Sequence, residues 1–226
     1  MNAEAPSRGL SAILKSLNCD RGYGLGLLAA CALLALLELG GDPLRNALSY
    51  DRAALAAGEW WRVITAHFVH LDAEHTLLNS LGVVLMWALF ARDYSPLRWL
   101  AIYLAASLAI SAGLWALNPE VPWYVGASGA LHGVMAAGTL AHLRRRDLDS
   151  WILAIILLGK LGYEQFAGSM PFAGDAKTVV DAHLYGAAGG LALAVLLRSR
   201  RVQTCSRFGA SKVDMKGGGA VRLINV

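Results

Sequence analysis

The sequence has few charged residues and little cysteine. Only 16% of its 226 residues are Asp, Glu, Lys or Arg, whereas 56% are hydrophobic; a soluble domain carries about 25% charged residues. Cys19, Cys31 and Cys205 have no metal-like spacing, and the chain has no His-Glu-x-x-His run. We therefore expect no disulfide, no metal site and no cofactor. The composition indicates a membrane protein.

Six apolar segments come close to the length of about 20 residues that crosses a bilayer. They are residues 23–39, 75–91, 97–117, 128–143, 151–166 and 178–197. Basic clusters such as residues 144–146 and 198–201 flank alternate ends, which places both termini in the cytoplasm. Such clusters mark helix ends beside membrane lipid, so no nucleic-acid partner is expected. The sequence predicts an all-α polytopic membrane protein, a six-transmembrane-helix bundle.

This organisation predicts three parts of the chain. Residues 1–22 are expected to form a cytoplasmic N-terminal segment, residues 23–200 the six-helix membrane domain and residues 201–226 a disordered basic C-terminal tail. The N-terminus resembles a signal peptide, but the absence of a clear cleavage site favours a retained first helix. The sequence makes no prediction of the oligomeric state.

Three polar residues share one depth in the predicted bundle. Counted from the basic flank of each segment at about 1.5 Å per residue, Ser128, His183 and Asn79 lie roughly 24, 22 and 20 Å above the cytoplasmic ends. Polar groups inside spans are costly and usually face a protein interior or a water-filled cavity. The shared depth predicts a reaction centre that is open to the outer side.

The residue types at this depth suit nucleophilic catalysis. Ser128 begins a predicted helix, whose first amides lack partners within the helix and can stabilise an oxyanion. A serine needs a base, and His183 lies at the matching depth. Asp181 is two residues from His183 and points to nearly the opposite face, so a Ser/His dyad is simpler than a triad. His75 and Asn79, four residues apart, could donate to the same oxyanion.

The same residues also have purely structural explanations. An isolated serine can bond to a carbonyl of its own helix. His132, one turn after Ser128, is either the base or a ring stacked on or bonded to His183, and the axial offset of i,i+4 side chains favours the second. Gly126 and Gly129, with Gly186 and Gly190, would let two helices approach closely. Simple helix packing explains these glycines equally well.

Four motifs, read together, resemble the rhomboid family of intramembrane serine proteases. They are "WWR" at residues 60–62, "HLDAEHTLLN" at 70–79, "GASG" at 126–129 and "AHLYGAAGG" at 182–190. The resemblance covers about residues 23–200. It implies a serine endopeptidase with Ser128 as nucleophile and His183 as base. It also implies His75, Asn79 and Ser128 as oxyanion donors, with His70, Trp60 and Arg62 in supporting roles.

A narrower resemblance is to rhombosortases, a compact bacterial branch of that family. It is carried by "GEWWRVITAHFVH", by "KLGYEQ" followed by "VVDAHLYG", and by "SGALHG", with His132 where rhomboids often have Tyr or Phe. The resemblance implies exported protein substrates anchored by a C-terminal Gly-Gly, a transmembrane segment and a basic tail. The implied act is cleavage near the Gly-Gly, or transfer of the acyl group to an amine. The implied location is a bacterial inner membrane, with the active site open to the periplasm.

Lys160, Tyr163 and Glu164 lie in the outer half of the fifth predicted helix. A snorkelling i,i+4 ion pair between Lys160 and Glu164 explains them structurally. The alternative is that they gate substrate entry or bind the Gly-Gly region.

Two other functions compete with a protease. One is a non-catalytic rhomboid-like protein that binds client helices, a class that usually lacks the serine or the histidine. The other is a haem or metal protein, whose candidate ligands are His70, His75, His132, His142 and His183. His142 is expected near the opposite membrane face from the rest, which argues against a common site.

Overall fold

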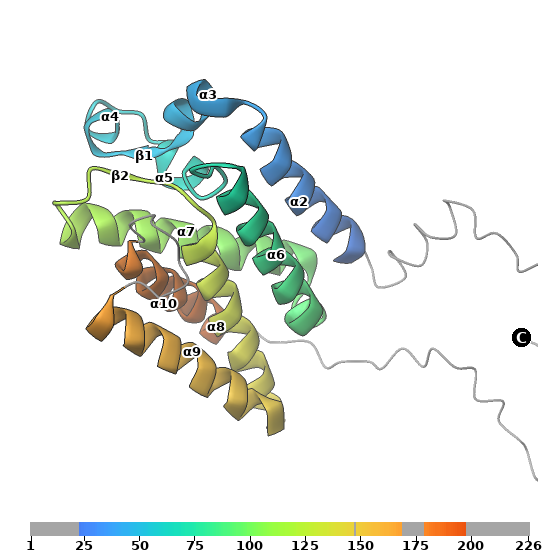
Figure 1. Ribbon diagram of the computed structural model, residues 1–226. Helices are drawn as coiled ribbons and strands as arrows, with labels where there is room; N and C mark the ends of the chain where they lie inside the picture. Colours follow the sequence, from blue (N-terminus) through green and yellow to red (C-terminus); the bar gives the residue numbers. More distant parts are fainter. Residues whose placement is uncertain (1–22, 147, 169–178, 198–226) are drawn as a thin grey trace, which may run out of the picture.

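The computed structural model describes residues 23–146, 148–168 and 179–197 (Figure 1). The predicted N-terminal segment of residues 1–22 and tail of residues 201–226 lie outside the described residues, as does the basic cluster at residues 198–201. Within the described ranges the chain forms nine helices and one two-stranded sheet. The prediction of a mainly helical protein is confirmed.

Six helices coincide with the six predicted apolar segments. They are α2 (Tyr23–Glu38), α6 (Ala73–Phe90), α7 (Pro96–Leu117), α8 (Ser128–Arg145), α9 (Leu148–Ala167) and α10 (Val180–Leu196). Local chemistry sets several of their ends. Asp72 Oδ1 accepts a bond from the backbone N–H of His75 at 2.8 Å and caps α6. Ser95 caps α7, and Pro96 occupies its first turn.

Two of these helices, α6 and α7, are long and apolar enough to cross a membrane by length and composition. The number rises to three if α2 and α3 (Gly41–Leu48), which are bent by 110° at their junction, count as one broken span. Helix α10 is apolar but has only 17 residues. The predicted count of six spans therefore exceeds what helix length and composition establish.

The segment between α2 and α6, residues 39–72, is called the outer segment and contains regular structure. It forms α3, β1 (Tyr50–Asp51), α4 (Arg52–Ala56) and α5 (Arg62–Thr65). Strand β1 pairs antiparallel with β2 (Trp123–Tyr124), just before α8. These pieces are too short to carry a clear hydrophobic period, so the sequence gives little sign of them.

A buried arginine holds this segment together. Arg62 donates from Nη1 to the carbonyl oxygens of Asn46 at 2.7 Å and Ser49 at 2.8 Å, and its Nε bonds to Glu59 at 2.7 Å. The planar guanidinium presents its donors in a rigid fork from several nitrogens, which the single nitrogen of a lysine does not provide. Trp60, in the same motif, is exposed. The arginine of the "WWR" motif thus has a structural role in the outer segment.

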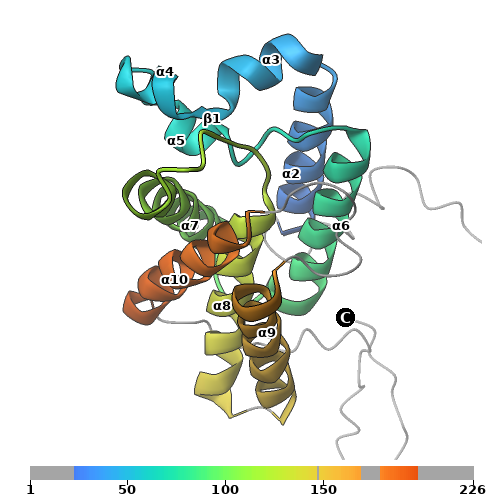
Figure 2. The same cartoon turned by 60° about the vertical axis from the view of Figure 1, so that its left-hand side comes forward.

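Helix α8 lies at the centre of the bundle, where it contacts α6, α7, α9 and α10 (Figure 2). Helix α10 packs most extensively on α8 and α7, while α9 lies along α8 and α2 lies along α6 (Figures 1 and 2). Glycines permit the closest approach. A Cβ on Gly133 would lie 2.6 Å from the carbonyl oxygen of Gly186, and one on Gly190 would strike the backbone of Gly133. The backbones of α8 and α10 therefore touch where the sequence places small residues.

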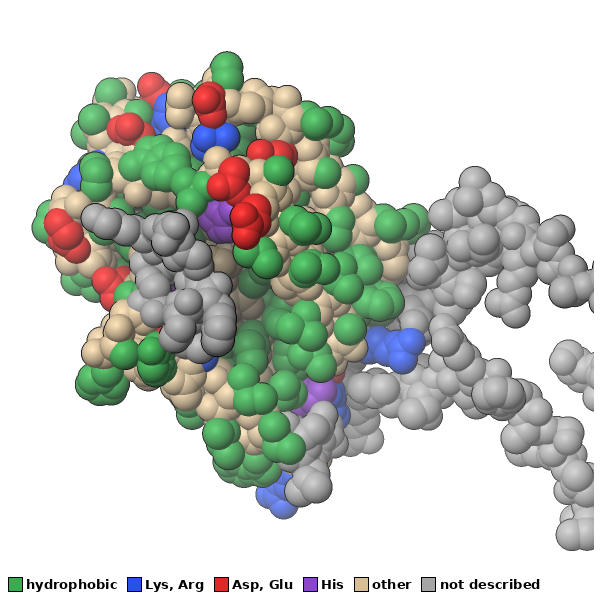
Figure 3. All heavy atoms as spheres, in the orientation of Figure 1, with side chains coloured by type: hydrophobic (Ala, Val, Ile, Leu, Met, Phe, Trp, Pro, Cys, Tyr) green, Lys and Arg blue, Asp and Glu red, His purple; other side chains and the backbone are tan. Residues whose placement is uncertain are grey.

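The surface carries an apolar band. In Figure 3 hydrophobic side chains cover the middle of the molecule over α6 and α9, and charged side chains gather toward the end formed by α3 to α5. The exposed apolar residues on these two helices include Leu77, Leu78, Leu81, Leu85, Ile152, Ile155, Ile156 and Leu158. A large apolar surface of this kind is suited to lipid.

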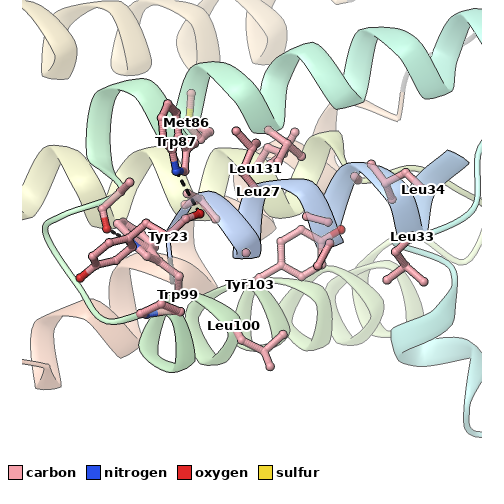
Figure 4. A pocket seen from close by; sticks show the side chains of 18 of the residues that line it. Tyr23, Leu27, Leu33, Leu34, Met86, Trp87, Trp99, Leu100, Tyr103 and Leu131 are labelled. Carbon is pink, nitrogen blue, oxygen red and sulfur yellow. Dashed lines mark hydrogen bonds between the residues drawn. The ribbon is translucent and has the colours of Figure 1, made fainter. Parts of the chain in front are cut away.

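An apolar cavity of about 560 Å³ lies between α2, α6, α7 and α8 (Figure 4). Tyr23, Trp87 and Tyr103 line it, and Leu131 faces it from α8. The Nε1–H of Trp87 donates to the carbonyl oxygen of Tyr23 at 3.1 Å across its rim. Ser128 and His183 are not among its lining residues.

Candidate active site

Ser128 and His183 meet between two helices. Ser128 is the first residue of α8, His183 lies in the first turn of α10, and Ser128 Oγ is 3.0 Å from His183 Nε2. The close contact of α8 with α10 brings them together, because Cβ atoms on Gly129 or Gly186 would collide with the facing helix backbone. The structure thus joins the two residues that the sequence predicted at equal depth.

A glycine turn positions the serine. Gly126 has φ +123°, a conformation that other residues rarely adopt, and its N–H donates to the carbonyl oxygen of Ala66 at 3.0 Å. A Cβ there would lie 2.9 Å from Cε1 of His75. Together with the β1–β2 pairing, this bond ties the segment before Ser128 to the outer segment.

His70 supports the same turn through a hydrogen bond to its backbone. Its Nε2 accepts a bond from the backbone N–H of Ala127 at 3.4 Å. Burial, with a smaller contribution from the neighbouring His75, lowers the pKa of His70 to about 3. The ring is therefore neutral at pH 7 and keeps the lone pair that accepts this bond.

His132 lies beside the base. Its Nδ1 is 2.7 Å from the carbonyl oxygen of Ser128, which can only accept, so Nδ1 carries the proton. Its ring stacks on that of His183, with centroids 4.2 Å apart and planes inclined by 19°. The structure places His132 against one face of His183 and not between His183 and Ser128.

Glu164 is the neighbour of His183 that the sequence analysis missed. Its Oε2 is 2.8 Å from His183 Nδ1, and its other oxygen bonds to Lys160 Nζ. The search for an acid considered only Asp181 on the same helix, whose carboxylate instead accepts from Asn118 Nδ2 at 2.8 Å. A usable signal was present, because Glu164 lies about 24 Å above Leu148 by helix rise, at the depth of Ser128.

His75 and Asn79, which the sequence predicts to be oxyanion donors, both belong to α6. The ring of His75 lies beside Gly126 and meets His70 edge-on, with centroids 5.0 Å apart. Asn79 is buried, and its Nδ2 donates one bond to the carbonyl oxygen of His75 at 2.9 Å. Within the part of the chain that the structure describes, the second N–H of that amide has no acceptor and can donate to another group.

Two of the candidate residues lie away from the pair. Trp60 is 64% exposed and Tyr163 is 43% exposed. Among the contacts of the described residues, no hydrogen bond or ring contact joins either of them to Ser128 or His183. Among the described residues, Lys160 is connected to the pair through its bond to Glu164.

Three side chains of the site could in principle hold a metal ion. His132, Glu164 and His183 each offer one ligand atom within 4.8 Å of the others. However, stacked and nearly parallel rings direct their nitrogen lone pairs side by side, whereas a tetrahedral ion needs them to converge. Hydrogen bonds already engage Nδ1 of His132, Nδ1 of His183 and Oε2 of Glu164, so a hydrogen-bonded group describes these side chains better.

The fold and the site define a class of protein: a helical membrane bundle that holds a serine–histidine pair between two helices. Residues 57–200 match the Rhomboid domain family, and the chain belongs to that family. Rhomboid proteins are multi-pass membrane proteins, and the rhomboid proteases among them are intramembrane serine proteases.

Named relatives agree with this assignment. YdcA of Bacillus subtilis (strain 168), a provisionally named rhomboid protease, is 29% identical over 152 residues, which cover 67% of this chain and 74% of YdcA. Rhomboid protease GluP of the same organism is 28% identical over 62% of this chain but only 28% of GluP. RHOMBOID-like protein 12, mitochondrial, of Arabidopsis thaliana is 26% identical over 58% of this chain and 45% of its own length.

Proposed function

We propose that the protein is an intramembrane serine endopeptidase that uses Ser128 as nucleophile and His183 as base. The observation that carries this proposal is the 3.0 Å contact between Ser128 Oγ and His183 Nε2 at the N-terminal end of α8. An isolated structural serine would not need a histidine from another helix. In hydroxyl–imidazole pairs of this kind, the base removes the proton as the oxygen attacks.

The proposed reaction has two steps. His183 Nε2 takes the proton of Ser128 while Oγ attacks the scissile carbonyl carbon, and the resulting imidazolium then protonates the leaving amine to give an acyl-enzyme. Water, or a second amine, then attacks that ester while His183 takes its proton, and the imidazolium gives this proton to Ser128 Oγ as the ester C–O bond breaks. The Ser128 N–H, His75 and the free N–H of Asn79 are the proposed donors to the oxyanion, where one lost donor costs about 10²–10³ in rate.

The proposed substrates are exported proteins whose C-terminus carries Gly-Gly, an apolar helix and a basic tail. Support comes from the rhombosortase-like motifs around Trp61, His132 and Lys160.

We further propose six spans with both termini inside, a membrane domain over residues 23–200, and a bacterial inner membrane with the site open to the periplasm. The six helices of the bundle and the apolar band support this placement.

Labelling and product analysis test the proposal. A fluorophosphonate probe should modify the wild type at Ser128 and leave Ser128→Ala unmodified. Co-expression with a Gly-Gly substrate should give a product whose new C-terminus mass spectrometry identifies: a free carboxylate means hydrolysis and an added amine means transfer. Persistent binding of the client helix with no labelling and no product would instead support the non-catalytic alternative.

A further inference from the structure

We infer that Glu164 is a positioning residue for the base, so that the site works as a chain Ser128–His183–Glu164 with Lys160 as counter-ion. This inference rests on the proposed serine protease function and extends it. The relevant bonds run from Ser128 Oγ to His183 Nε2 at 3.0 Å and from His183 Nδ1 to Glu164 Oε2 at 2.8 Å.

The carboxylate selects the tautomer of His183. An ionised Glu164 has no proton to give, so the contact at 2.8 Å requires that His183 Nδ1 carries the hydrogen. In a neutral imidazole the other nitrogen then keeps its lone pair. That nitrogen is Nε2, which faces Ser128 Oγ. Glu164 thus keeps the basic nitrogen on the side of the nucleophile.

Lys160 keeps the carboxylate ionised. The side chain of Glu164 is 3% exposed, and a buried carboxylate without partners would take up a proton instead. Each of its oxygens has its own partner, Oε1 with Lys160 Nζ and Oε2 with His183 Nδ1. The side chain of Lys160 is 32% exposed, so it is less buried than its partner. When His183 takes the serine proton, the imidazolium forms next to this anion and is stabilised by it.

An ion pair of purely structural purpose does not explain this arrangement. Lys160 and Glu164 at i,i+4 would satisfy one another on the surface of α9 without reaching another helix. Here Glu164 is turned inward, and its second oxygen bonds to α10, on which α9 packs less than on α8. His132 fixes one face of the same imidazole. The ring of His183 is therefore held at its edge by Glu164 and at its face by His132.

The test uses the full chain in detergent micelles, with the rate of fluorophosphonate labelling at Ser128 and the kcat and KM of Gly-Gly substrate cleavage as readouts. Glu164→Gln has the same size but can present an N–H to Nδ1 and favour the wrong tautomer. We expect labelling rate and kcat to fall about 10²- to 10³-fold, with KM changed less than about threefold. The Glu164→Asp variant, which keeps the carboxylate, should have a labelling rate and a kcat at least about tenfold higher than those of Glu164→Gln.

Asp181→Asn is the matched control, because it removes a carboxylate two residues from His183 that bonds to Asn118 and not to the base. It should label within about twofold of the wild type. Equal labelling of wild type and Glu164→Gln would overturn the inference while leaving the protease function intact. A wild type that is not labelled at Ser128 would overturn the protease function itself.

Thermal unfolding separates positioning from stability. If Glu164→Gln is too unstable to purify, Glu164→Asp decides: a lower kcat at unchanged melting temperature supports the inference. Loss of activity that follows the loss of melting temperature in both variants, with KM rising in parallel, would show a structural role only and contradict it.

Discussion

The ring of His132 lies 4.2 Å from the ring of His183, face to face, while its own Nδ1 bonds to the carbonyl oxygen of Ser128. This nitrogen is occupied by the helix backbone, and among the described residues no hydrogen bond joins the other nitrogen of His132 to Ser128 Oγ. We therefore expect His132 to support the base by its shape and not by proton transfer.

Substitutions at His132 test this expectation. His132→Phe keeps a flat ring against His183 and should retain activity within about fivefold. His132→Ala removes the stack, which is worth about 0.5–1.5 kcal/mol, and should lower kcat by about 2- to 13-fold as His183 becomes less well held. Cleavage kinetics at equal protein level measure both, and a His132→Phe variant with less than about 1% of wild-type activity would show an acid–base role instead.

Gly186 is predicted to be intolerant of even one methyl group. A Cβ there would overlap the carbonyl of Gly129, one residue after Ser128, so Gly186→Ala must push α10 away from α8. Both the melting temperature and the labelling of Ser128 should fall. Gly162→Ala is the control: it meets open space and favours the helix by about 1 kcal/mol. Similar melting curves for the two variants would contradict the close contact between α8 and α10.

The stability of the protein should fall as the pH is lowered below 6.5. Burial lowers the pKa of His67 to about 4 from a usual value of 6.5. Between pH 4 and pH 6.5 the unfolded chain therefore binds a proton at this histidine, whereas the folded chain does not. Stability is fully present above pH 6.5 and decreases by at most about 1.4 kcal/mol per pH unit down to pH 4 for this one group. His67→Gln should show a shallower pH dependence of the melting temperature, and an unchanged slope would refute the assignment.

Removal of metal ions should leave the activity unchanged. The proposed chemistry needs only the hydroxyl, the imidazole and backbone or side-chain donors. Dialysis of the purified protein against EDTA, followed by the cleavage assay, should return activity within about twofold of the untreated sample. A loss that added Zn²⁺ restores would favour metal binding by His132, Glu164 and His183.

The positions of the six long helices were predictable because they follow from apolar run length alone. The outer segment was not, because α3 to α5 and the β1–β2 pair depend on distant partners such as the carbonyls that Arg62 binds. No local period in residues 40–74 encodes those partners.

The candidate site shows the same division. Helix rise gives the height of a residue, and height was enough to pair Ser128 with His183. The contact of Glu164 depends instead on how α9 is rotated about its own axis, because a rotation of 100° moves from one residue to the next on a helix. The depth argument, applied to α9 as well, would have included Glu164, but only packing shows that it faces His183.

The bond from the Gly126 N–H to the Ala66 carbonyl, together with the pairing of Tyr50 with Tyr124, fastens Ser128 to the outer segment. In the proposed orientation, the depth of the nucleophile is therefore set by the outer segment and not by the bilayer midplane. In lipids of different acyl length the helices can tilt to match the thickness, while the serine keeps its place beneath the outer segment. A substrate helix would then be cut at a fixed number of residues from its outer end, whatever the thickness of the membrane around it.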